Sequence, residues 1–160
     1  MFNTDIFGTK DSKMNIKDEI KSCDVIFVAD AFAEDYLGGA ELTTETFYSN
    51  SDGLKVCKLR AGLVNPELVQ EGIMKHWVFF NYSALNINLV PVIIANLNYS
   101  IVEYDYKFCK YRSIEKHRQV EDQDCDCHNQ QNGKIISAFM YGADNLMWMS
   151  KAQRDLYFER

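Results

Sequence analysis

Thiol and imidazole side chains gather in one long polar segment, at about residues 107–132, that contains few aliphatic residues. The metal-ligating residues of this segment are Cys109, His117, Cys125, Cys127 and His128. Four soft ligands of this kind suit a zinc ion in a tetrahedral site. We predict a structural zinc held by Cys109, Cys125, Cys127 and His128. Only one residue separates Cys125 from Cys127, unlike the paired cysteines of zinc fingers, so a loop with free thiols is the alternative.

A glycine pair follows the first strongly apolar run of the chain. This run, residues 25–29, ends at Asp30, and Gly38 and Gly39 come shortly before a helix-like stretch that contains Glu41. Glycine lets backbone N–H groups approach a phosphate closely, and a helix N-terminus favours an anion. The pair belongs neither to the dinucleotide fingerprint nor to a P-loop, which disfavours a nucleotide-cofactor oxidoreductase. An anion site and a plain turn are the two interpretations.

The elements that must position these residues alternate between apolar strands and helical stretches. We predict strands at about 25–29, 54–59, 76–80, 99–103 and 145–149, and helices at about 14–20, 39–48, 66–73, 84–95, 134–141 and from 151 onward. This rhythm predicts right-handed crossovers and a parallel sheet. We therefore expect one α/β domain over residues 1–160, a three-layer Rossmann-like fold with a mostly parallel sheet of about five or more strands.

Single residues refine this prediction. Ser83 and Ser150 are placed to cap helices, and Pro91 must kink the helix at 84–95 unless it begins that helix. Trp77 and Phe79 alternate along a strand and are expected to face the core. The segment at 107–132 is expected to be the least regular part of the chain.

Composition narrows the class of protein. The 160-residue chain has a net charge of −6 and a pI near 5.0, without a basic stripe, which argues against nucleic-acid binding. Residues 1–5 contain neither basic residues nor an apolar run, so no secretory signal is expected. The apolar stretch 87–97 is too short for a transmembrane segment. Five cysteines, an odd number, favour reduced thiols and a cytoplasmic location.

Several segments together resemble the N-terminal domain of family 4 glycosyltransferases with the GT-B fold. The most specific piece is the strand that ends in Asp30, followed by a loop and Gly38-Gly39-Ala40-Glu41. Segments 76–81, 103–106 and 148–153 fit in the same order, and the resemblance spans about residues 23–160.

The resemblance implies roles for particular residues. Gly38 and Gly39 would bind the donor diphosphate. Glu103 and Asp105 would be catalytic and would line the cleft near the transferred sugar. The acceptor-binding residues would be Asp30, Tyr104 and Tyr106. No cofactor is required for transfer in such enzymes, so zinc would be structural.

The family's donor-binding C-terminal domain, with its paired glutamates, has no counterpart in this sequence. We therefore expect transfer from a nucleotide-sugar donor to a sugar or glycan acceptor only when a donor-binding domain completes the enzyme, in cis or in trans. The last helix runs to the end of the chain, which suggests that something follows it. The alternative is a non-catalytic Rossmann-like or flavodoxin-like binding or partner module, in which Glu103 and Asp105 pair with Lys107, Lys110 or Arg112.

Overall fold

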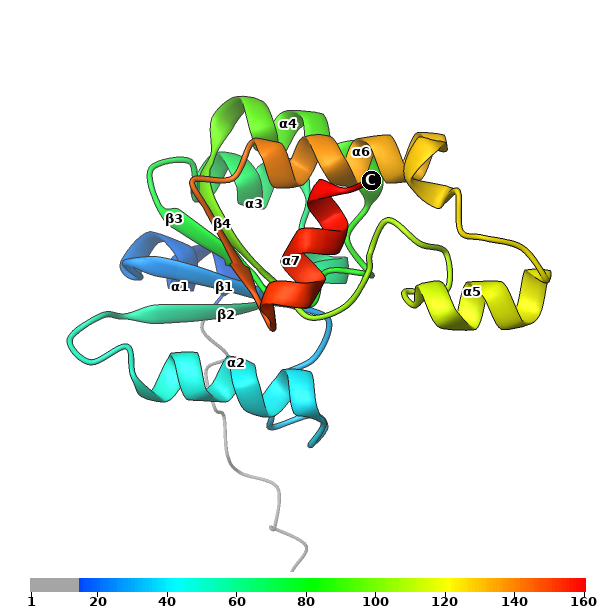
Figure 1. The fold of residues 1–160 in the computed structure, drawn as a ribbon. Coiled ribbons are helices and arrows are strands. Elements are labelled where there is room, and N and C mark those ends of the chain that lie inside the picture. Colours follow the sequence, from blue (N-terminus) through cyan, green and yellow to red (C-terminus); the bar gives the residue numbers. More distant parts are fainter. Residues whose placement is uncertain (1–14) are drawn as a thin grey trace, which may run out of the picture.

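A sheet of five parallel strands organises the chain (Figure 1), and its order is β2-β1-β3-β4-β5. The strands are β1 (Val25–Ala29), β2 (Val56–Arg60), β3 (His76–Phe79), β4 (Asn98–Glu103) and β5 (Asn145–Trp148). This computed structural model describes residues 15–160, so residues 1–5, where no secretory signal is expected, lie outside the described part. In register, Val28 lies opposite Leu59 of β2 and Phe79 of β3. The predicted α/β fold with a parallel sheet is confirmed.

Helices cover both faces of the sheet. One face carries α1 (Ile16–Ser22), α3 (Pro66–Glu71), α4 (Val90–Asn96) and α6 (Gln131–Tyr141), and the other carries α2 (Gly39–Ser49). The chain ends with α7 (Lys151–Phe158), which lies beside α6. Short 3₁₀ turns are η1 (Ala61–Leu63), η2 (Ile87–Leu89) and η3 (Cys127–Asn129), and α5 (Ile114–Glu121) lies away from the sheet. The result is the three-layer arrangement that the alternation of elements predicts.

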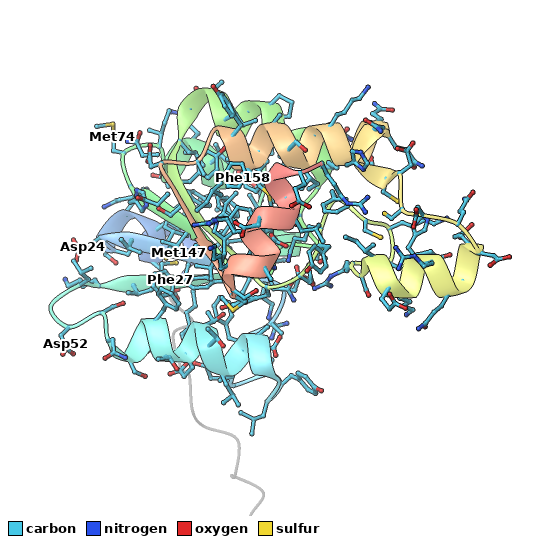
Figure 2. All side chains as sticks on the ribbon, in the orientation of Figure 1. Asp24, Phe27, Asp52, Met74, Met147 and Phe158 are labelled. Carbon is cyan, nitrogen blue, oxygen red and sulfur yellow. The ribbon has the colours of Figure 1, made fainter. Side chains whose placement is uncertain are left out.

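The core is divided by the sheet because strand residues point alternately to its two faces. Trp77 and Phe79 are fully buried against the larger helical layer, as predicted. Phe27 and Phe80 point to the opposite face, where Phe47 of α2 packs on Phe80. Figure 2 shows Phe27 in the space between the sheet and α2. Aromatic pairs of this kind add to the free energy gained by burial.

Pro91 lies at the beginning of its helix, which is the predicted alternative to a kink. Helix α4 begins at Val90 rather than near residue 84, and the proline lies in its first turn, where the missing N–H is tolerated. The prediction for Ser83 is wrong, because this residue caps no helix. Instead, Asn86 accepts a hydrogen bond from the backbone N–H of Asn88 at the start of η2. Ser150 does cap α7, and it accepts from the Gln153 N–H at 3.1 Å.

The polar segment contains a helix that the sequence does not predict. Ser113 caps α5 by accepting a hydrogen bond from the Lys116 N–H, and the buried residue of this helix is His117. No apolar period marks α5, since its inward side presents an imidazole rather than a row of aliphatic side chains. Across residues 15–160, no helix combines the length and the apolar character needed to cross a bilayer.

Candidate functional site

The carboxyl ends of β1, β3 and β4 meet at one edge of the sheet, because the strands are parallel and adjacent. Asp30 follows β1 there, and its carboxylate accepts hydrogen bonds from the backbone N–H groups of Ser83 at 3.0 Å and Ala84 at 2.8 Å. Asp30 therefore ties the end of β1 to the segment after β3. Its predicted contact with an acceptor stays a prediction, since both oxygens of the carboxylate are engaged within the chain.

The glycine pair begins α2, the helix that follows β1 in the chain. Gly38 is the N-cap residue and makes no side-chain cap, and Gly39 is exposed. A side chain added at Gly39 would meet no atom within 4 Å, whereas one added at Gly38 would lie 2.4 Å from a carboxylate oxygen of Glu41. The backbone at Gly39 is thus open to solvent. The buried Glu41 carboxylate already lies near the start of the helix, where a negative charge is favoured.

Glu103 ends β4 and is fully buried. Its carboxylate accepts hydrogen bonds from the hydroxyls of Tyr82 and Tyr157, both at 3.2 Å, and the Lys107 ammonium lies 3.5 Å away. Burial raises the pKa of Glu103 to about 7, while the positive charge of Lys107 opposes this rise. Burial also raises the pKa of both tyrosines. A carboxyl poised near neutrality can exchange protons at physiological pH.

Asp105 lies just beyond Glu103 and pairs with two cations. Lys107 Nζ is 3.0 Å from Asp105 Oδ1, and Arg112 Nε donates to Asp105 Oδ2 at 2.7 Å. Arg112 also donates to Asn81 Oδ1 at 2.9 Å, which links the loop after β4 to the end of β3. These are ion pairs that the sequence offered as the alternative to a catalytic role.

A pocket of about 360 Å³ opens over the ends of β3 and β4. Its lining includes Tyr82, Ser83, Lys107, Cys109, Lys110, Arg112 and Asn132, with an apolar wall of Leu85, Ile87, Val90 and Ile136. Glu103 and Asp105 do not line this pocket. Glu103 reaches it through two residues that do, Tyr82 and Lys107.

The two tyrosines predicted to bind an acceptor lie apart from the pocket lining. Tyr104 packs with the core beneath α2, and its hydroxyl is 3.0 Å from the Thr44 hydroxyl. Burial raises the pKa of Tyr104 to about 12. Tyr106 stacks on Tyr157 with ring centroids 5.9 Å apart. In this arrangement both rings serve packing, and their acceptor contacts stay a prediction.

A second cluster lies beside the pocket, within the polar segment. Cys109, His117, Cys125 and Cys127 are all buried, and their ligand atoms lie within 4.8 Å of one another. His117 Nδ1 is 3.7 Å from the Cys109 sulfur and 3.6 Å from the Cys127 sulfur. This cluster could bind a metal ion.

The histidine of this cluster differs from the one that the sequence favours. His128 packs its ring against Phe108, and its buried Nδ1 has no hydrogen-bond partner. The fold turns His117 of α5 toward the thiols instead. Sequence spacing places both histidines in the same segment, and only the direction of α5 distinguishes them.

The partners of Glu103 are a further set that sequence reasoning missed. Tyr82 is 21 residues and Tyr157 is 54 residues from Glu103 in the chain. No local pattern could link them, because their hydroxyls meet only when the segment after β3 and helix α7 fold against the end of β4.

In comparisons with known proteins, no protein-family model, no curated protein and no solved structure matches this chain. We therefore infer function from the geometry of the site and from the resemblance of the segment around Gly38 and Gly39.

Proposed function

We propose that this chain is the acceptor-side, N-terminal domain of a GT-B glycosyltransferase. In this proposal, a donor-binding domain in cis or in trans completes the enzyme, which transfers a sugar from a nucleotide-sugar donor. The observation that carries the proposal is the open backbone at Gly39, the first residue of α2, which follows the loop after β1. In parallel α/β sheets, ligands bind at this edge.

An anion at the start of α2 would interact with backbone N–H groups that have no partner within the helix. Helix α2 is 11 residues long, so its first turn is well formed. The carboxylate of Glu41 lies near Gly38 and would repel a diphosphate at short range. We infer that Glu41 weakens anion binding in the isolated domain, and that a bound diphosphate displaces this side chain.

The acidic residues at and just after the end of β4 act indirectly in this proposal. Glu103 is buried and does not line the pocket, so it holds Lys107 and Tyr82 in place as a positioning residue. Asp105 positions Lys107 and Arg112 in the same way. Fixed cations at this edge would stabilise the negative charge that develops on a departing diphosphate.

For the cysteine–histidine cluster we propose a structural zinc ion. Three thiolates and one imidazole form a closed donor set that is typical of structural zinc sites. With Zn–S bonds of about 2.3 Å and Zn–N bonds of about 2.0 Å, tetrahedral ligand atoms lie roughly 3.5–3.8 Å apart. The separations of 3.6 and 3.7 Å between His117 Nδ1 and two of the sulfurs match this spacing. A cytoplasmic location, expected from the odd number of cysteines, is part of this proposal.

Titration with inorganic pyrophosphate tests the anion site. We expect Gly39→Val to weaken pyrophosphate binding at least about fivefold, because a branched side chain would cover the backbone N–H groups, at a position where a Cβ meets no atom within 4 Å. Glu41→Gln should strengthen binding, since it removes the competing charge. Thr46→Val, on an exposed part of the same helix, is the matched control. Equal affinity in the Gly39 variant and the control would contradict the assignment.

Sugar transfer is tested separately with labelled nucleotide sugars. We expect no turnover by the chain alone, and turnover when a donor-binding domain is joined to it or added in trans. Turnover by the isolated chain would refute the proposal that transfer requires a separate donor-binding domain.

An apolar groove favours the second candidate, a non-catalytic partner module. The groove between α6 and α7 is lined by Met140, Tyr141, Leu146, Trp148 and Phe158, among others. Tyr141 is 94% exposed and Phe158 is 78% exposed. If pyrophosphate does not bind and no added domain gives transfer, the partner-module function replaces the glycosyltransferase function.

A further inference from the structure

We propose that a metal ion bound by Cys109, His117, Cys125 and Cys127 acts as a brace, which orders the loop that forms one wall of the neighbouring pocket. The inference rests on the proposed zinc site but not on sugar transfer. It states that metal loading determines whether the loop after β4 presents Lys107 and Arg112 in an ordered arrangement.

Helix α5 lies away from the sheet and contacts the loop after β4 through Glu121, which pairs with Lys110 and accepts from the Tyr111 hydroxyl. The buried residue of α5 is His117, and the other residues of this helix are polar, exposed or only partly buried. The apolar cluster around the site is small, with Phe108 as its one buried aromatic residue. A metal–imidazole bond therefore supplies the attachment that an apolar face gives to an ordinary surface helix.

The loop after β4 is closed around one of the ligands. The Cys109 N–H donates to the Tyr106 carbonyl at 2.9 Å, and the Arg112 N–H donates to the Cys109 carbonyl at 2.8 Å. Arg112 has a φ of +56°, a left-handed backbone conformation that is unfavourable for residues other than glycine. A strained residue of this kind persists only where its surroundings hold it. Fixing the Cys109 sulfur on a metal fixes the centre of this turn.

The same turn presents the cations of the site. Lys107 lies two residues before Cys109, and its side chain is 3% exposed between Glu103 and Asp105. Arg112 lies three residues after Cys109 and reaches Asp105 and, beyond it, Asn81.

Cys109 itself lines the pocket, together with Lys107 and Arg112. The loop after β4 thus contains the metal ligand Cys109 and the two cations Lys107 and Arg112, and all three line the pocket. Loss of the metal should release Arg112 from its left-handed conformation and open the link to the end of β3.

The experiment combines metal analysis with hydrogen exchange on the whole chain. We expect about one zinc per chain in the wild type and in His128→Ala, and at least a roughly tenfold loss of zinc affinity in His117→Ala. This pair of variants is matched, since both remove an imidazole from the same segment. Amide exchange in residues 103–113 should be at least about tenfold faster in His117→Ala and in chelator-treated wild type. Adding zinc back should restore protection in the wild type.

Protection of β1 and α4 serves as the internal control. It should be unchanged on chelation, which separates local loosening from global unfolding. The chelated wild type keeps the test valid if His117→Ala does not fold.

Each other outcome overturns a defined part of the proposal. No zinc in the wild type overturns the metal site, and loss of zinc in His128→Ala rather than His117→Ala overturns the ligand set. Bound zinc with equal exchange of residues 103–113 in the presence and absence of metal overturns the brace alone. None of these outcomes depends on sugar transfer, so failure of the glycosyltransferase proposal remains distinguishable.

Discussion

Replacing Glu103 with glutamine should change how stability depends on pH. The folded-state pKa of Glu103 is about 7, raised from 4.5 by burial. Folding therefore takes up a proton between these two values, and the free energy of unfolding falls as the pH rises from about 4.5 to about 7. Glutamine stays neutral across this pH range, so the free energy of unfolding of the variant does not fall for this reason.

The magnitude follows from the two pKa values. Linkage gives a loss of roughly 2–3 kcal/mol in the wild type between pH 5 and pH 8, at about 1.4 kcal/mol per pKa unit. Glutamine fits the same hydrogen bonds. Its oxygen can accept from Tyr82, and its amide can donate to the Tyr157 hydroxyl, whose single proton then goes to the Asp105 carbonyl 3.1 Å away. Lys107 keeps Asp105 as its ionic partner.

Urea unfolding of both proteins at pH 5 and pH 8 measures this difference. We expect the glutamine variant to gain roughly 2–3 kcal/mol relative to the wild type over this interval. Comparing the two proteins at each pH cancels contributions from other groups, including the thiol cluster. Glu159→Gln, at an exposed carboxyl, controls for the removal of one negative charge. If the two free energies change in parallel with pH, Glu103 is ionised in the folded protein and the reasoning is wrong.

Two further substitutions test how the site is supported. Gly133→Ala should lower the free energy of unfolding by about 1–3 kcal/mol in a thermal or urea melt, because the added carbon would lie 2.1 Å from the Cys127 carbonyl oxygen. Gly62→Ala, whose nearest contact is 3.6 Å away, should be nearly neutral, and equal effects of the two would contradict the close approach. Asp30→Ala should destabilise the protein by about 1–3 kcal/mol, since two backbone N–H groups lose their acceptor. Asp30→Asn keeps one acceptor oxygen and should have a smaller effect, and a neutral alanine variant would show that water replaces the carboxylate.

The sequence alone determined the sheet and the edge at which chemistry is expected. Continuous apolar runs such as Val25–Ala29 predict strands buried on both faces, because such strands have no polar side to present. Alternation with helices then requires parallel strands, whose carboxyl ends share one edge. For this reason Asp30, Gly39 and Glu103 could be assigned to one edge without knowledge of the fold.

Tertiary structure decided which side chains meet at that edge. Glu103 reads from the sequence as an acid at a strand end, yet folding buries it under Tyr82 and Tyr157 and raises its pKa. Burial and long-range contacts of this kind depend on the packing of distant segments, which leaves no local pattern.

The cysteine–histidine cluster likewise depends partly on the sequence and partly on the folded structure. The residue types and their concentration in one segment indicate a metal site, because thiolates and imidazoles share a preference for zinc. The choice of His117 over His128 depends on α5, a helix with no apolar period to reveal it. Composition thus determines what a segment can bind, while the direction of each side chain is fixed only when the backbone around it is folded.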